Sequence, residues 1–215
     1  MSCDVCIPWR PTTPERAAIF DVVRDWWHDH GFRVITGDSG HTTFNRAASR
    51  NVAVALAHTD EVVVADADTL PEIEVMHRAV ELSARAMVYP FDRYASLDGR
   101  ALGLRRLDQV DPRWIKHNAP GGIFAINRAA YIRLGGQDPG FTGWGFEDDA
   151  FALVARELHQ VIRLRGTVYA FEHAEARDWS ELNPGHARLE SYHTAVRTRR
   201  LTELLATLAS PGASS

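Results

Sequence analysis

The sequence predicts a single α/β domain in which a mostly parallel sheet is flanked by helices. A length of 215 residues suits one compact domain and would be cramped for two. The composition, with 45% hydrophobic and 24% charged residues, is that of an ordinary globular protein. Strand-like apolar runs alternate with amphipathic helical stretches through the first half of the chain, which is the pattern of a layered α/β sheet.

Each element of the first half has its own local signal. Thr13 is expected to cap a helix that has Pro14 at its first position. The apolar stripe of this helix continues through Trp26 and Trp27, which we assign to the core, and Gly31 stops it. The expected strands are 3–7, 32–36, 61–65 and 87–89, and the expected helices are 14–30, 45–58 and 71–86.

The second half of the chain is less regular. The helix that begins at Glu147 opens with three acids, which suit the positive end of a helix dipole. No element is assigned to the variable-looking stretch 91–118, and 210–215 is expected to be a disordered tail. The expected strands are 123–126, 161–164 and 168–171, and the expected helices are 128–134, 147–157 and 186–208.

Neither charge nor hydropathy indicates a nucleic-acid or membrane protein. The formal net charge of −4 gives no global basic field. The longest apolar runs, 52–57 and 62–65, fall far short of the roughly 20 residues that span a bilayer. Residues 1–10 lack the pattern of a secretory signal. We therefore expect a cytoplasmic protein without a membrane anchor, from a bacterial or phage-infected host cell.

The two cysteines form a CxxC motif near the N-terminus. A zinc site of the paired type needs a second pair of ligands at similar spacing, and none follows Cys3 and Cys6. We therefore expect two reduced thiols in or near the first strand.

Polar residues follow several of the expected strands. In parallel sheets ligands bind beyond the carboxyl ends of the strands, where Pro8, Arg10 and Asp38 lie. Asp66 and Asp68 follow the strand 61–65, and alternation places both carboxylates on one side of the chain. Two hard oxygen donors at this spacing suit Mn²⁺ or Mg²⁺ bridging a diphosphate. An ordinary acidic turn at a strand end is the alternative interpretation.

A second cluster of chemistry-bearing residues lies at 144–149. Capping the helix needs one acid, so the run of Glu147, Asp148 and Asp149 is larger than a cap requires. Trp144 just before it has an indole able to stack on a sugar. A carboxylate here could act as general base for an acceptor hydroxyl.

His173 stands alone at the end of the expected strand 168–171. A structural histidine is one interpretation. The other is that its imidazole completes the metal coordination begun by Asp68, because Mn²⁺ accepts one nitrogen among oxygens.

Four sequence blocks together resemble the metal-dependent GT-A glycosyltransferases, and most closely the β-1,4-galactosyltransferase family. Their order along the chain is more specific than any single motif. The blocks are Cys-Ile-Pro-Trp-Arg at 6–10, Phe-Asn-Arg-Ala at 44–47, Asp-Ala-Asp-Thr-Leu-Pro at 66–71, and the Gly-Gly segments from 121 to 136 with Gly-Trp-Gly-Phe-Glu-Asp-Asp at 143–149.

The resemblance implies a GT-A fold, Mn²⁺ or Mg²⁺ as cofactor, and a role for each matching residue. The residues implied in substrate binding, with Asp38 added for its place at a strand end, are Pro8, Arg10, Asp38, Phe44, Arg46, Asp66, Gly122, Trp144 and Glu147. The implied metal ligands are Asp68 and His173, and the implied catalytic base is Asp148. Where the family has a thioether ligand three residues before the histidine, this chain has Ala170.

The resemblance also implies a domain plan and a reaction. One domain spans 1–209, with a nucleotide-sugar half at 1–90, an acceptor and catalytic half at 119–173 and a C-terminal helix at 185–209. The expected reaction is inverting transfer from a UDP-sugar to a hydroxyl on a protein, a glycan or a modified nucleobase. The alternatives are a sugar nucleotidyltransferase, whose usual Gly-rich first turn is missing here, and a non-catalytic sugar- or nucleotide-binding module.

Overall fold

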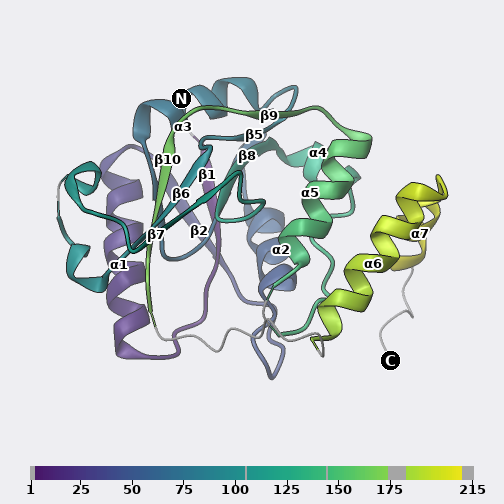
Figure 1. Ribbon diagram of the computed structural model, residues 1–215, viewed down its shortest axis with the longest axis horizontal. Helices are drawn as coiled ribbons and strands as arrows, with labels where there is room; N and C mark the ends of the chain where they lie inside the picture. The colour runs from purple at the N-terminus through teal and green to yellow at the C-terminus, as the bar shows by residue number, and fades with distance from the viewer. Residues whose placement is uncertain (1–2, 105, 144, 174–182, 210–215) are drawn as a thin grey trace.

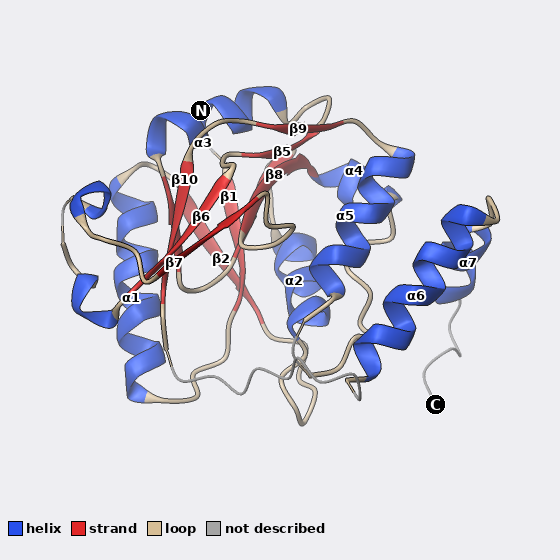
Figure 2. Ribbon diagram, in the orientation of Figure 1, coloured by secondary structure: helices blue, strands red, loops and turns tan. Residues whose placement is uncertain are grey.

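The computed structural model describes residues 3–104, 106–143, 145–173 and 183–209, and these form two mixed sheets with helices around them (Figures 1 and 2). The first sheet has the strand order β2-β1-β3-β8-β5-β9. Its strands are β1 (Asp4–Pro8), β2 (Arg33–Gly37), β3 (Glu61–Ala65), β5 (Met87–Tyr89), β8 (Ile123–Asn127) and β9 (Val161–Arg163). The predicted strands of this sheet are therefore confirmed to within a residue at each end.

Strand direction brings the ends of several strands to one edge of this sheet. β1 runs parallel to β2 and β3, so their carboxyl ends lie together. β8 is antiparallel to β3 and pairs Ile123 with Ala65, so the residues before β8 reach the same edge. The backbone N–H of Asp66 donates to the carbonyl of Gly122 over 2.8 Å and continues this pairing past the strand ends.

The second sheet has the order β4-β10-β6-β7, and the sequence did not predict it as a unit. The stretch 91–118, to which the sequence assigns no element, holds β6, β7 and two short 3₁₀ helices (Gly99–Ala101 and Leu107–Gln109). All four residues of β7 are exposed, so the strand has no buried alternation that could reveal it. The strands of this sheet are β4 (Thr69–Pro71), β6 (Arg93–Leu97), β7 (Trp114–His117) and β10 (Thr167–Phe171).

The helices lie on both sides of the strands. In Figure 1 α1 and α3 lie to the left of and above the strands, whereas α2, α4 and α5 lie to their right. Thr13 caps α1 by accepting from the N–H of Arg16, as predicted, and Asn45 caps α2 in the same way. Pro71 ends β4 and does not start a helix, so α3 begins two residues later than predicted. The helices are α1 (Pro14–Asp29), α2 (Arg46–Leu56), α3 (Ile73–Leu82), α4 (Arg128–Arg133) and α5 (Glu147–Leu158).

The C-terminal region contains two helices, so the prediction of one continuous helix over 186–208 is wrong. α6 (Pro184–Arg197) and α7 (Leu201–Ala209) form the outermost layer beside α5 (Figure 1). Arg199 has a φ of 57°, and the N–H of Arg200 returns to the carbonyl of Ala195 over 2.7 Å. This left-handed closure ends a helix without the glycine that normally signals it. The predicted tail 210–215 lies outside the described residues.

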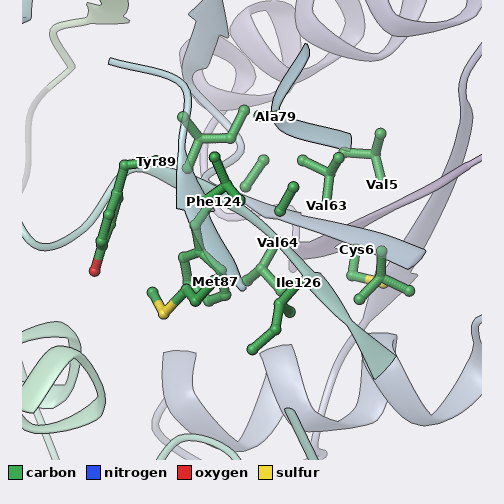
Figure 3. Packing of buried hydrophobic residues seen from close by; sticks show 14 of the residues in the cluster. Val5, Cys6, Val63, Val64, Ala79, Met87, Tyr89, Phe124 and Ile126 are labelled. Atoms are coloured by element: carbon green, nitrogen blue, oxygen red, sulfur yellow. The ribbon is translucent and has the colours of Figure 1, made fainter. Parts of the chain in front are cut away.

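The hydrophobic core lies between the first sheet and its helices. Figure 3 shows side chains of β1, β3, β5, β8 and α3 packed together, including Val63, Met87 and Phe124. Trp27 is fully buried, which confirms its assignment to the core. Among the described residues, no helix is long and apolar enough to cross a membrane.

Both cysteines are buried with free thiols, as the sequence predicts. Burial raises the pKa of the Cys3 thiol to about 12, helped by the nearby Asp4 carboxylate. Burial also raises the pKa of Cys6. Both thiols are therefore protonated and unreactive at neutral pH.

Candidate active site

A pocket of about 410 Å³ opens at the sheet edge where β3, β8 and the start of α5 meet. Its wall is assembled from five separate stretches of chain. The lining residues are Arg46, Asp66, Asp68, Tyr94, Trp114, Lys116, Ala119, Pro120, Gly121, Gly122, Gly145, Phe146, Asp148 and Asp149.

The Asp-Ala-Asp turn after β3 supplies two carboxylates to this pocket. Asp66 and Asp68 both line it, whereas Ala67 between them is buried. Both carboxylates therefore face one pocket, as predicted, but a turn at 67–68 places them there and not the alternation of a strand. The carbonyl of Asp68 accepts from the N–H of Phe171 over 2.9 Å, so the turn is held by both sheets.

His173 lies two residues after the end of β10, and the second sheet thereby places it next to Asp68. Its Nε2 lies 2.9 Å from Oδ2 of Asp68. Two neighbouring ligands of one octahedral cation lie about 3.0 Å apart when each bond is about 2.1 Å long. The pair therefore has the spacing and the oxygen and nitrogen donors that Mn²⁺ accepts.

The described residues contain no group of three or more His, Cys, Asp or Glu side chains arranged for a metal. Ala170, at the position of the family's thioether ligand, is buried in β10 and carries no donor. Two protein ligands still fit a cation that takes its remaining ligands from a diphosphate and water, as Mg²⁺ commonly does. Arg16 adds positive charge here, with Nη1 at 3.3 Å from both ring nitrogens of His173.

Two arginines one turn apart on α2 form the electrostatic centre of the site. Arg50 is buried, and its Nη1 lies 2.6 Å from Oδ1 of Asp148, while its Nη2 pairs with Asp66. Arg46 pairs with Glu147, which is almost wholly buried behind it. A helix brings residues four apart onto one face, so both guanidinium groups reach the same acidic cluster.

This network sets the charge of the carboxylates. Burial raises the pKa of Asp148, but Arg50 and Arg46 outweigh burial and hold it below the usual value. Asp148 is therefore ionised at neutral pH. For Asp66 burial dominates over the same two arginines and raises the pKa. Burial and the charge of Asp148 also raise the pKa of Asp149.

Three predicted donor-binding residues form a separate cluster that does not line the pocket. Arg10 binds Asp38 with both ends of its guanidinium, at 2.7 and 2.6 Å, and its Cζ lies 5.5 Å from the ring centroid of Phe44. The Arg10 hydrogen bonds lower the pKa of Asp38 to about 2. Pro8 ends β1 beside this cluster and is buried.

The structure brings five predicted residues together at the pocket and separates others from it. Glu147 lies behind Arg46 and His173 behind Asp68, and Trp144 lies outside the described residues. The five at the pocket are Arg46, Asp66, Asp68, Gly122 and Asp148.

Sequence reasoning missed several residues of the site. Arg50 could have been suspected from its place one turn after Arg46. Gln137 had no local signal, because its contacts with Arg50 and Asp148 come from distant segments. Tyr94 and Trp114 lie in the stretch with no predicted element, and their rings stack with centroids 5.7 Å apart. Also missed were Lys116, Gly121 and Asp149 as lining residues.

A family model and a solved structure both resemble this chain. Residues 104–175, about a third of the chain, match the family model described as the N-terminal domain of galactosyltransferase. A variant of Drosophila β-1,4-galactosyltransferase 7 in complex with manganese, UDP-Gal and xylobiose superposes with a TM-score of 0.59 at 18% identity, over 86% of this chain and 79% of that one. The chain has the GT-A fold.

Further solved structures share this GT-A fold. The catalytic domain of Drosophila β-1,4-galactosyltransferase 7 with xylobiose has a TM-score of 0.57 at 20% identity, over 88% of this chain and 79% of that one. GalNAc-T7 with UDP, GalNAc and Mn²⁺ has a TM-score of 0.56 at 14% identity, over 94% of this chain and 51% of that one. No curated protein sequence matches the chain.

The comparisons confirm the predicted fold, and with it the resemblance to the galactosyltransferases. The matched segment 104–175 contains Asp148, His173 and the wall formed by β7. The family match and the GT-A fold together indicate a glycosyltransferase.

Proposed function

We propose that the protein is a metal-dependent, inverting glycosyltransferase that moves a sugar from a UDP-sugar to a hydroxyl acceptor. The observation that carries this proposal is the single pocket that joins the Asp-Ala-Asp turn to the acidic start of α5. Asp66 and Asp68 follow β3, Asp148 lies at the start of α5, and all three line that pocket. A donor and an acceptor bound in it would have a metal ligand and a base within reach.

On the donor side, Asp68 and His173 would hold Mn²⁺ or Mg²⁺, and this ion would stabilise the negative charge of the departing UDP. Arg10, Phe44, Asp38 and Pro8 would hold the uridine end, next to the strand ends of β1 and β2. Arg46, which faces the pocket, would approach the diphosphate, and Asp66 the ribose or sugar. Solved structures of the same fold contain manganese with UDP-Gal, or Mn²⁺ with UDP.

On the acceptor side, Asp148 would take the proton of the attacking hydroxyl as it displaces UDP in line. An in-line displacement forms the new glycosidic bond on the face opposite the leaving group, so it inverts the anomeric centre. Trp144 would complete the sugar pocket, and Glu147, which is paired with Arg46, would hold that arginine toward the donor.

Among the acceptor classes, we favour a glycan. The stacked pair Tyr94 and Trp114 gives the pocket an aromatic wall that suits a pyranose ring. Lys116 and Asp149 beside it offer charged partners for hydroxyl groups. The Drosophila structures of this fold contain xylobiose.

The proposal extends to the plan of the chain and its location. Residues 1–90 would bind the nucleotide-sugar, 119–173 would supply the acceptor side, and the whole domain would span 1–209. A cytoplasmic setting agrees with two free, buried thiols.

Isothermal titration of the protein with UDP, with and without Mn²⁺, tests this function. We expect tight binding with Mn²⁺ and weak binding after EDTA treatment, because the ion links the diphosphate to Asp68 and His173. Equal affinity in both conditions would contradict metal dependence. Binding without turnover of any UDP-sugar would favour a binding module, and release of pyrophosphate from UTP with a sugar phosphate would favour a nucleotidyltransferase.

A further inference from the structure

We propose that Arg50 is a positioning residue which, with Gln137 and Gly121, fixes Asp148 so that only its Oδ2 is offered to the acceptor hydroxyl. This inference rests on the proposed function, because it concerns the base of that reaction. It assigns a role to the buried cation on α2 and names the carboxylate atom that receives the proton.

The first step is that Oδ1 of Asp148 is already occupied. Nη1 of Arg50 donates to it over 2.6 Å, and Nε2 of Gln137 donates to it over 3.0 Å. The same Nη1 also donates to Oε1 of Gln137 over 2.7 Å, so the three side chains form a closed triangle. Arg50 and Gln137 are 1% and 0% exposed, which leaves them no room to rotate away.

The second step concerns Oδ2, which packs against the backbone of Gly121. A Cβ at Gly121 would overlap Oδ2 and Cγ of Asp148. Gly121 is not in the left-handed region, so glycine is needed here for space and not for backbone conformation. Nη2 of Arg46 lies 3.9 Å from Oδ2, beyond hydrogen-bond distance. Within the described chain no donor occupies Oδ2, and Asp148 lines the pocket.

The third step is that the same guanidinium reaches the donor side. Nη2 of Arg50 pairs with Asp66 in the Asp-Ala-Asp turn. Within the described residues, Nε of Arg50 is buried without a hydrogen-bond partner. Such an unsatisfied buried donor costs stability. The side chain is therefore oriented to reach both carboxylates, at the expense of its own complete hydrogen bonding.

The fourth step is the charge balance around Asp148. Besides Arg50, the charged groups around it are Arg46 on α2, Asp66 in the Asp-Ala-Asp turn, and the acids Glu147 and Asp149 on its own helix, while Lys116 lines the same pocket. The phenols of Tyr89 and Tyr131 also interact with it, and burial raises the pKa of both, so they stay neutral. Removing the charge of Arg50 leaves burial and these acids to favour the protonated form of Asp148. The pKa of Asp148 would then rise, and a larger share of the enzyme would hold a protonated base at neutral pH.

The test compares Arg50→Met, Arg50→Lys and Gly121→Ala in the full chain. For Arg50→Met we expect kcat at pH 7 to fall on the order of 10²-fold, within the usual contribution of a general base. We also expect the acidic limb of its pH profile to move to higher pH. Arg50→Lys keeps a charge and should keep the limb near its original position, with a lower kcat. Gly121→Ala should stay folded and lose at least about tenfold in kcat, because its Cβ displaces Oδ2.

Arg33→Met is the matched control, because Arg33 pairs with the fully buried Asp4 at the opposite end of β1. It should lower stability without moving the acidic limb. A ¹³C NMR titration of the Asp148 carboxyl, assigned by its loss in Asp148→Asn, gives a second readout that needs no activity.

An unchanged acidic limb and an unchanged carboxyl titration in Arg50→Met would overturn the proposal, as would wild-type kcat in Gly121→Ala. If Arg50→Met does not fold, the kcat values of Arg50→Lys and Gly121→Ala test the proposal, and wild-type values in both would overturn it. Should the wild-type protein transfer no sugar, the proposed function fails, and the NMR titration of Asp148 in Arg50→Met and Gly121→Ala still decides whether these residues hold Asp148.

Discussion

At the residue scale, the site depends on which carboxylates are paired and which face the pocket. Glu147, Asp148 and Asp149 are adjacent in sequence, yet each has a different environment. Glu147 is buried against Arg46, Asp148 shares Arg50 with Asp66, and Asp149 is exposed at the pocket. The sequence shows that these three acids are more than a helix cap requires, which indicates a functional site. It does not separate the three roles, because their partners lie on α2.

Asp148→Asn should lower kcat by about 10²- to 10⁴-fold while UDP affinity persists. The amide oxygen can still accept from Arg50 and Gln137, so the fold should be retained. Steady-state transfer rates and UDP titration on one preparation provide the measurement. Asp149→Asn is the neighbouring control and should cost much less. Full activity in Asp148→Asn, or equal losses in binding and rate, would move the base to another residue.

Asp68→Ala should abolish metal-dependent transfer, since a charged ligand to the ion contributes several kcal/mol of transition-state stabilisation. His173→Ala should act in the same direction but less severely, because water can replace a neutral ligand. Mn²⁺ titration of UDP binding measures both effects. Asp60→Ala, before the opposite end of β3, is the control and should behave as wild type. Normal Mn²⁺ dependence in Asp68→Ala would remove this residue from the metal site.

At the element scale, local pattern predicts the strands of the first sheet and fails for the second. β1, β3 and β8 are short buried runs with clear ends. β7 is fully exposed, and β10 finds its partners β4 and β6 far away in the sequence. The aromatic wall of the pocket was missed for the same reason. Arg50 was missed because its partners Asp66, Gln137 and Asp148 lie in distant parts of the sequence. The helical pattern around Arg50 gives no sign that they are close in space.

Helix α6 holds the loop that precedes α5, and this contact can be tested by stability. Arg188 binds Asp138 with two hydrogen bonds of 2.6 and 2.8 Å, and Asp138 is buried next to Gln137. Arg188→Ala should lower the free energy of unfolding by about 1–3 kcal/mol, because the buried Asp138 carboxylate loses its cationic partner and keeps only the hydrogen bonds from Tyr192 and Gly140.

Chemical denaturation measures this loss. Arg197→Ala is the control on the same helix, because it breaks an exposed pair with Glu190 and should change stability by at most about 1 kcal/mol. Equal losses in the two variants would show that α6 does not secure the loop through Asp138.

At the scale of the whole molecule, the site exists only when the two predicted halves interleave. β8, from the second half, lies between β3 and β5 of the first sheet, and β10 lies between β4 and β6 of the second. The Asp-Ala-Asp turn, the Gly-Gly segment and the start of α5 meet at this shared edge. The sequence blocks predict the fold because each has a local signature, and the family resemblance they carry implies the pair Asp68 and His173. Their distances to Arg50 and Gln137 depend on the complete topology.

The central claim is that this pocket transfers a sugar from a UDP-sugar in a metal-dependent reaction. The most direct measurement is UDP release from a panel of UDP-sugars with glycan acceptors, in Mn²⁺ and after EDTA treatment, for the wild type and Asp68→Ala. We expect one UDP-sugar to give acceptor-dependent release that requires Mn²⁺ and is lost in Asp68→Ala. Release that survives EDTA treatment and the Asp68→Ala substitution, or no release from any donor in Mn²⁺, would contradict this account.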